Sequence, residues 1–236
     1  LDLNAEEVAG KLQAACSDLR FGYYNETSGQ EEPIPYWIES CTDTSDIHVY
    51  VKMPEINASS YAYLYYGNDD ARDASNGSET FEFFDDFSTI EAGDWGANAA
   101  NWATDNGSAY STVGGSTTTI NGVYTFPTSY ATEMRVKANS TSGSAGYYYF
   151  GNGLSGGSAK YLRFFFDPLT PRVNLRYGAS NNYYTVGSDQ YQHYTLISDF
   201  INNNYTLLIN HSIEAIEVSG YYAAEVQQPR LSSYYH

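Results

Sequence analysis

The chain has 236 residues, and its 28 Asp and Glu against only 11 Lys and Arg give a formal net charge of -17 at pH 7. A surface field of this sign repels phosphate backbones and anionic lipids, so nucleic acid is not an expected partner. Large apolar side chains are mainly aromatic, with 25 Tyr and 11 Phe against two Met, which is typical of packed β-sheets. No apolar stretch of about 18 residues occurs, and no membrane span is expected.

The N-terminal segment carries the best helical pattern in the sequence. Residues 4–15 place Ala5, Val8, Leu12 and Ala15 on one face, and Asn4 stands where an N-cap is expected. One short helix is therefore predicted over 4–15. Short aromatic and β-branched runs follow and predict the strands of a small antiparallel β-sandwich at 19–24, 36–39, 47–52 and 61–66.

The residue composition and the spacing of the predicted strands change near Phe81. A polar segment rich in Asn, Asp, Gly and Ser separates the strand at 61–66 from the aromatic run 81–87, and it is interpreted as a hinge between two domains. Beyond it, Gly, Ser, Thr and Asn separate short strands predicted at 81–87, 101–104, 117–126, 130–137, 146–151, 160–166, 172–177, 183–186, 193–198, 205–210, 213–218 and 226–235. Asn121 and Gly122 add a type I′ hairpin signal.

This order of elements predicts an all-β fold of two antiparallel β-sandwich domains with one short N-terminal helix. The first domain is predicted over residues 1–80. The second, over 81–236, has the strand number and spacing of a two-sheet jelly roll.

The two cysteines of the chain, Cys16 and Cys41, are 25 positions apart in the first predicted domain. They form either a disulfide or a pair of buried thiols. The disulfide is favoured because the other compartment signals are extracellular.

These signals are seven N-x-[ST] sequons, most of them beside predicted turns, where an N-glycan can project into water. Together with a chain that begins at Leu1 without a leader-like segment, they predict a mature, secreted glycoprotein at the cell surface. The seven acceptors are Asn25, Asn57, Asn76, Asn106, Asn139, Asn204 and Asn210.

Several motifs of the first domain also resemble a known family. In order, they are Cys16-Ser17-Asp18-Leu19-Arg20-Phe21, Tyr36-Trp37-Ile38-Glu39, Val49-Tyr50-Val51-Lys52-Met53-Pro54, Tyr63-Leu64-Tyr65-Tyr66-Gly67-Asn68 and Phe84-Asp85-Asp86-Phe87. This series resembles the domain-of-unknown-function 2341 family of secreted and surface proteins, many of them archaeal. The resemblance implies that a concanavalin A-like or laminin G-like sandwich follows, and it implies no chemistry.

An enzyme is not expected. Glycosidases need two carboxylates facing one cleft, and Glu82 and Asp86 share a strand face without matching a glucanase motif. No metal or cofactor site is assigned, because the four histidines, His48, His193, His211 and His236, show no ligand spacing. Calcium stays open as an alternative to solvated loop carboxylates, with oxygen ligands from Asn68, Asp69, Asp70, Asp73, Asp85 and Asp86.

The leading functional hypothesis is a non-enzymatic, glycosylated surface or appendage subunit that polymerises with copies of itself. An open sheet edge near Leu1 would accept a strand from a neighbour, with Val226 to Tyr235 as one donor, and a contact that does not close gives a filament. The alternative is a lectin-like carbohydrate-binding or adhesin module in which Trp95, Trp102, Tyr183 and Tyr184 form a stacking platform, or these aromatics simply pack across strands.

Overall fold

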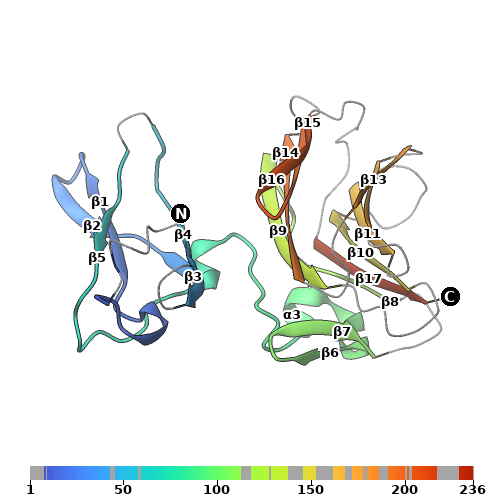
Figure 1. The fold of residues 1–236 in the computed structure, drawn as a ribbon, viewed down its shortest axis with the longest axis horizontal. Coiled ribbons are helices and arrows are strands. Elements are labelled where there is room, and N and C mark those ends of the chain that lie inside the picture. The colour runs from blue at the N-terminus through green and yellow to red at the C-terminus, as the bar shows by residue number, and fades with distance from the viewer. Residues whose placement is uncertain are drawn as a thin grey trace. The chain divides into compact units, whose positions relative to one another are not determined.

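The structure is a computed structural model. It describes residues 8, 10–42, 46–57, 60–112, 118–127, 129–137, 146–152, 162–167, 172–177, 180–185, 191–199, 201, 204–216 and 229–235. The chain forms two compact units, Leu1–Asp85 and Asp86–His236, and the strands in both pair antiparallel (Figure 1). The fold is therefore all-β. The boundary follows Asp85, whereas the sequence placed it after Thr80.

The first unit is a small sandwich of two sheets. One sheet has the order β2-β1-β5, from β1 (Arg20–Asn25), β2 (Gln30–Pro33) and β5 (Tyr63–Tyr65), and the other pairs β3 (Tyr36–Thr42) with β4 (Asp46–Val51). Alternate side chains of both sheets point inward, so Phe21 and Leu64 meet Tyr36 and Val49 in one apolar core.

A disulfide joins Cys16 to Cys41, the pairing that the sequence favoured, with a Cα–Cα distance of 6.1 Å. Cys16 is fully buried and lies in the core, so the bond ties the segment before β1 to β3. The neighbouring Asp18 is also buried, and its carboxylate accepts the backbone N–H groups of Gln13 at 2.8 Å and Gly67 at 2.6 Å. These bonds connect the N-terminal segment to the loop after β5.

The predicted helix over 4–15 is wrong in its C-terminal part. Val8 is helical and buried, but the chain turns at Gly10, which has φ of +68°, and only a short 3-10 helix, η1 (Ala14–Cys16), follows. Ala15 also takes a left-handed φ of 56°. Gly10 adopts positive φ at little cost, so helical periodicity alone does not carry the helix past it. Residues 4–7 lie outside the described residues.

The strand predicted over 81–87 is wrong as well. A one-turn helix, α2 (Gly77–Thr80), leads into an irregular segment, and the rings of Phe81 and Phe84 cover the outer face of β3-β4. Their centroids lie 5.7 Å and 5.0 Å from the centroid of Trp37. We call residues 76–84 the clasp. It explains why the first unit extends to Asp85.

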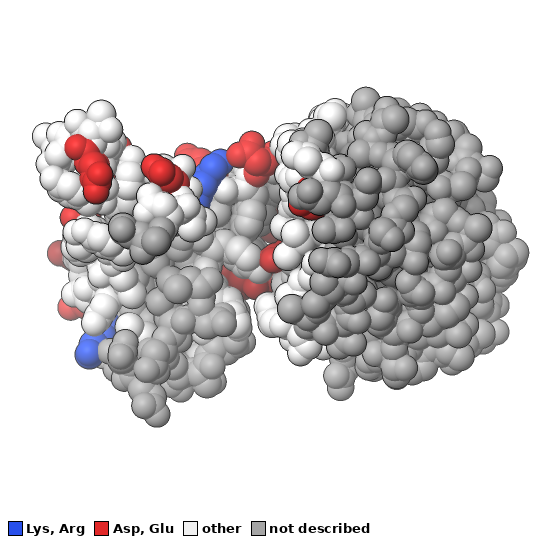
Figure 2. All heavy atoms as spheres, turned by 90° about the horizontal axis from the view of Figure 1, so that it is seen from above, with Lys and Arg blue, Asp and Glu red and all other residues white. Residues whose placement is uncertain are grey.

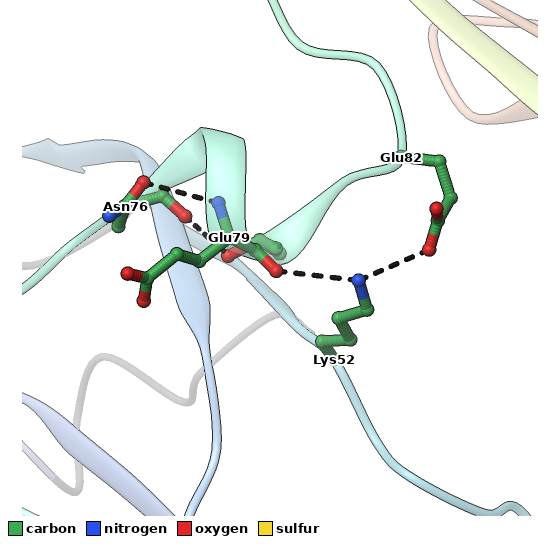
Figure 3. A network of polar contacts seen from close by, with 5 residues as sticks. Lys52, Asn76, Glu79 and Glu82 are labelled. Carbon is green, nitrogen blue, oxygen red and sulfur yellow. Dashed lines mark hydrogen bonds and ion pairs between the residues drawn. The ribbon is translucent and has the colours of Figure 1, made fainter.

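Polar contacts hold the two ends of the clasp (Figure 3). Asn76 caps α2, because its side-chain oxygen accepts a hydrogen bond from the backbone N–H of Glu79 at 3.2 Å. Lys52, directly after β4, donates a hydrogen bond to the backbone oxygen of Glu79 at 3.4 Å. Lys52 also pairs with Glu82 at 3.1 Å. Both partners of this ion pair are exposed, so the aromatic contacts hold the clasp more than the ion pair does.

The second unit contains two larger sheets that appear as two layers in Figure 1. The six-stranded sheet has the order β13-β12-β11-β10-β17-β8, and the four-stranded sheet has the order β16-β15-β14-β9. Their strands are β8 (Thr118–Asn121), β9 (Ser129–Lys137), β10 (Gly146–Asn152), β11 (Leu162–Asp167), β12 (Arg172–Tyr177), β13 (Ser180–Thr185), β14 (Tyr191–Asp199), β15 (Asn204–Ile209), β16 (Ser212–Ile216) and β17 (Pro229–Tyr235).

The core of the second unit, among its described side chains, centres on β14 and β15. Tyr194 and Leu196 are 1% exposed, Leu207 is fully buried, and burial raises the pKa of the Tyr194 hydroxyl. Smaller elements complete the unit: α3 (Ala92–Trp95), η2 (Ala97–Asn101) and the hairpin β6 (Trp102–Asp105) and β7 (Ser108–Ser111).

The hairpin predicted at Asn121 and Gly122 is wrong. The strand β8 ends at Asn121 and pairs with β17, while the next strand, β9, belongs to the other sheet. Type I′ turns instead occur at Asn106-Gly107, where φ is 49° and 71°, and at Asn210-His211, where φ is 48° and 65°. The dipeptide signal cannot distinguish a tight turn from a crossing between sheets.

Candidate binding face

The outer face of the sheet β2-β1-β5 carries a group of tyrosines. Because side chains alternate along a strand, Phe21 and Leu64 enter the core while their neighbours Gly22, Tyr63 and Tyr65 lie on the opposite face. The register places Gly22 between Pro33 on β2 and Tyr63 on β5. We call this surface the tyrosine face; its members are Gly22, Tyr24, Glu31, Tyr61, Tyr63 and Tyr65.

Glycine at position 22 makes room for a carboxylate. A Cβ atom there would lie 2.5 Å from Oε1 of Glu31, so the Glu31 carboxylate reaches across β1 and lies over the glycine. The hydroxyl of Tyr65 donates to Oε2 of Glu31 at 2.6 Å and fixes it from the β5 side. This hydrogen bond, aided by burial and by the negative charge of Glu31, raises the pKa of Tyr65. The phenol therefore stays protonated and remains a donor.

The tyrosine rings around Glu31 are unusually open to solvent. Tyr61 is 60% exposed, Tyr65 48% and Tyr24 46%. The ring centroids of Tyr61 and Tyr63 are 5.4 Å apart at an interplanar angle of 85°, and their hydrogen bond raises the pKa of Tyr63. A contiguous set of exposed aromatic rings on one sheet face is a feature of binding surfaces.

The stacking platform expected in the second unit is wrong for both tryptophans. Trp95 is only 2% exposed and stacks with Phe87 at 6.0 Å, and Trp102 is 8% exposed at the start of β6. Trp95 is the last residue of α3 and Trp102 directly follows η2, so both buried indoles belong to the part of the unit that contains the short helices. The side chains of Tyr183 and Tyr184, on β13, lie outside the described residues.

The side chains considered for catalysis or calcium binding contact nearby groups of the chain, where the structure describes them. Glu82 pairs with Lys52, and Asp86 accepts the N–H of Ser88 at 2.9 Å. Asn68 and Asp73 accept backbone N–H groups two residues ahead, in turns. Within the described residues, no three His, Cys, Asp or Glu side chains converge on a point that could hold a metal ion.

Two of the four histidines come together in the second unit. His193 on β14 stacks on His211 with ring centroids 4.5 Å apart, and its Nε2 lies 3.7 Å from Oε2 of Glu133. The two histidines are far apart in the sequence, so the sequence alone does not show their contact. The register of β14 and β15, which places Tyr194 opposite Ile209, brings them together. Only the pairing of β14 with β15 could have revealed it.

The sequons differ in what their amide groups do. Asn25 donates from Nδ2 to Glu32 at 2.8 Å, and Asn210 donates to Gln192 at 2.6 Å. Hydrogen bonds from Ser28, which has the larger effect, and from Asn25 lower the pKa of the Glu32 carboxyl group. Asn57, Asn76 and Asn106 are exposed, and Asn106 sits at the tip of the β6-β7 hairpin. Asn139 and the side chain of Asn204 lie outside the described residues.

One family model matches part of the chain. The family model of the domain of unknown function DUF2341 matches residues 15–105, which covers most of the first unit and the start of the second. This match supports the resemblance seen in the sequence. No curated protein matches the chain.

Solved structures similar to the chain are β-sandwich proteins. A carbohydrate-binding module, CBM66, from Bacillus subtilis has 9% identity and a TM-score of 0.43, covering 57% of this chain and 87% of its own. A Bacillus licheniformis β-glucanase has 14% identity and a TM-score of 0.48, covering 65% and 84%. Sheep galectin-11 has 12% identity and a TM-score of 0.34, covering 50% and 88%. Likeness this low does not extend to function.

No helix among the described residues is long and apolar enough to cross a membrane.

Proposed function

We propose that the chain is a non-enzymatic, extracellular carbohydrate-binding module and that the tyrosine face of its first unit holds the sugar. The observation that carries this proposal is the exposure of Tyr24 and Tyr65, on one face of the sheet β2-β1-β5, and of Tyr61, two residues before β5, at 46% to 60%. The function expected as the alternative in the sequence is thus preferred, although at a different place from the platform predicted there.

The chemistry of sugars fits these rings. One side of a pyranose ring presents C–H groups, which pack against an aromatic face, while its hydroxyl groups pair with phenols and carboxylates at the edge. Tyrosine offers both an apolar ring and a polar tip, and only two side-chain torsions are fixed on binding. Tyr63 and Tyr65 lie on β5, and the ring of Tyr61, just before the strand, packs against that of Tyr63.

Replacing Tyr61 by alanine is expected to weaken glycan binding about tenfold, the loss typical of one aromatic anchor. The ligand is first found by screening the full chain on a glycan array, and its Kd is then measured by isothermal titration calorimetry. Tyr110→Ala is the matched control, since Tyr110 is 48% exposed on β7 of the second unit. Equal losses in both variants, or an array without binding, would overturn the proposal.

The extracellular assignment is supported by the disulfide and by the sequons. N-glycans are expected to occupy Asn106 more fully than Asn25 or Asn210. A glycan on either of the latter two must displace or crowd a hydrogen bond of Nδ2, to Glu32 or to Gln192, whereas Asn106 projects from a hairpin tip. Peptide mapping of native material by mass spectrometry measures the occupancy at each site. Higher occupancy at Asn210 than at Asn106 would contradict this expectation.

Assembly with copies of the chain is a second candidate function, favoured by one observation. The strand β5 lies at the edge of the sheet β2-β1-β5, and the unpaired backbone groups of a sheet edge can accept an added strand. Regular fibres of native material in negative-stain electron microscopy would support a filament-forming appendage subunit. Discrete monomers at every salt and calcium concentration would rule it out.

A further inference from the structure

We propose that the tyrosine face selects a cationic glycan, an oligosaccharide of amino sugars with free amines, over the same oligosaccharide with its amines acetylated. This inference rests on the proposed function and names the chemical class of its ligand. It follows from where the charge of the chain lies and from the position of Glu31 among the tyrosines.

The negative charge of the chain is concentrated in the first unit. Residues 1–85 contain 17 acidic and four basic residues, a formal net charge of -13, while residues 86–236 contain 11 acidic and seven basic residues. Figure 2 shows acidic side chains spread over the described surface of the first unit, with few basic ones. Such a field attracts cations and repels anionic polysaccharides, so uronic acid or sulfated sugars are poor candidates.

One carboxylate lies within the ring array itself. Oε1 of Glu31 lies over Gly22, and Oε2 accepts the hydroxyl of Tyr65, so the carboxylate is held in place by a glycine beneath it and a phenol beside it. Tyr65 also consumes one acceptor position of Glu31 without neutralising its charge. A ligand that packs on the exposed rings therefore meets a negative group at their centre.

A basic residue on the same strand, Arg20, directs its guanidinium to other groups. Arg20 directs its guanidinium to the backbone oxygens of Ser17, at 3.0 Å, and of Leu19 and Arg72, and to the hydroxyl of Tyr36. Arg20 is thus used to tie loops of the first unit together. These neutral partners orient the guanidinium without removing its charge, but the first unit has 17 acidic against four basic residues, so its overall field still attracts a cation from solution.

An ammonium group gains from both parts of the surface. It forms a charge-assisted hydrogen bond with a carboxylate, and a cation is attracted to the faces of nearby tyrosine rings. An acetylated amine keeps the sugar ring for stacking but carries no charge. Because Glu31 and its tyrosines are solvent-exposed, the gain is moderate and is reduced by salt.

The test compares two ligands of equal length, a β-1,4-linked glucosamine hexamer and its fully N-acetylated form, against the full chain by calorimetry. The buffer is held at a pH where direct titration shows the glucosamine amines to be protonated. We expect at least tenfold tighter binding of the free-amine hexamer at low salt, and we expect this preference to shrink at 0.5 M salt.

Two variants distinguish a specific role of Glu31 from the effect of the overall negative charge of the first unit. Glu31→Gln keeps the shape of the side chain and is expected to remove most of the preference, because it weakens binding of the free-amine hexamer much more than binding of the acetylated hexamer. Glu26→Gln, in the exposed turn after β1, removes the same charge outside the tyrosine face and is expected to change the preference less than twofold. Hydrogen exchange of both variants checks that the first unit is folded.

Four results would overturn the inference. Equal binding of both hexamers refutes charge selection yet leaves carbohydrate binding intact, whereas binding of neither hexamer, with a silent glycan array, refutes the proposed function too. Equal effects of Glu31→Gln and Glu26→Gln mean that only the overall charge attracts the ligand. Tighter binding of a lysine hexapeptide than of the glucosamine hexamer reassigns the surface to a basic protein partner.

Discussion

Replacing Cys16 and Cys41 together by alanine is expected to lower the free energy of unfolding of the first unit by about 3 kcal/mol. The bond closes a loop across a sequence separation of 25 residues, and the entropy that such a loop removes from the unfolded chain corresponds to about this value. The first unit is small and depends on the bond, because Cys16 is fully buried in its single core.

Hydrogen exchange measured by mass spectrometry distinguishes the two units. Amides of the core strands β1 and β3 should lose protection, while those of β14 and β15 should keep theirs. Chain of the natural sequence that is unfolded and refolded in excess reductant serves as the control, since it keeps both thiols and lacks only the bond. A loss of protection in the second unit, or none in the first, would contradict the expected role of the disulfide.

Most strands of the chain could be predicted from sequence because their patterns are local. Alternation of apolar and polar residues, bounded by Gly, Asn and Ser, located β9, β12 and β14 to within two residues at each end. The disulfide was accessible from the cysteine count. Each of these features depends on a few neighbouring residues or on composition, so the sequence is enough to specify it.

The wrong predictions concern features that depend on distant partners. The aromatic run after Thr80 alternates like a strand, but Phe81 and Phe84 pack on Trp37 from β3 rather than pairing with a neighbouring strand. Trp95 was expected to be exposed because loops surround it, yet its ring, at the end of α3, is buried and stacks with Phe87. A loop position in the sequence therefore does not establish exposure.

The tyrosine face was partly visible in the sequence. Tyr61, Tyr63 and Tyr65 alternate with smaller residues and with Leu64, and a glycine inside a strand, here Gly22, often marks a place that another group approaches closely. What the sequence lacks is the register. Only the pairing of β1 with β2 and β5 places Glu31 over Gly22 and beside Tyr65.

Replacing Gly77 by alanine is expected to destabilise the first unit by about 2 kcal/mol, the usual cost of overpacking. A Cβ atom at position 77 would lie 2.3 Å from Cε1 and Cζ of Phe84, so the ring has to leave its place. Phe84 would then lose its contact with Trp37, at 5.0 Å between centroids, and its stacking on Phe81 at 5.7 Å. Better helix propensity of alanine in α2 offsets at most about 1 kcal/mol of this loss.

Gly93→Ala is the matched control, because Gly93 lies in the equally short helix α3 and no heavy atom outside its own surroundings is within 4 Å of the Cβ that alanine would add. It is expected to change the stability of the second unit by less than about 1 kcal/mol. Urea unfolding followed by hydrogen exchange measures both variants. Adding Phe84→Leu to Gly77→Ala should recover part of the loss, since a smaller side chain no longer meets the new methyl group. Without such a recovery, the cost of Gly77→Ala would lie in the α2 backbone, and the clasp would not depend on Phe84 resting over a glycine.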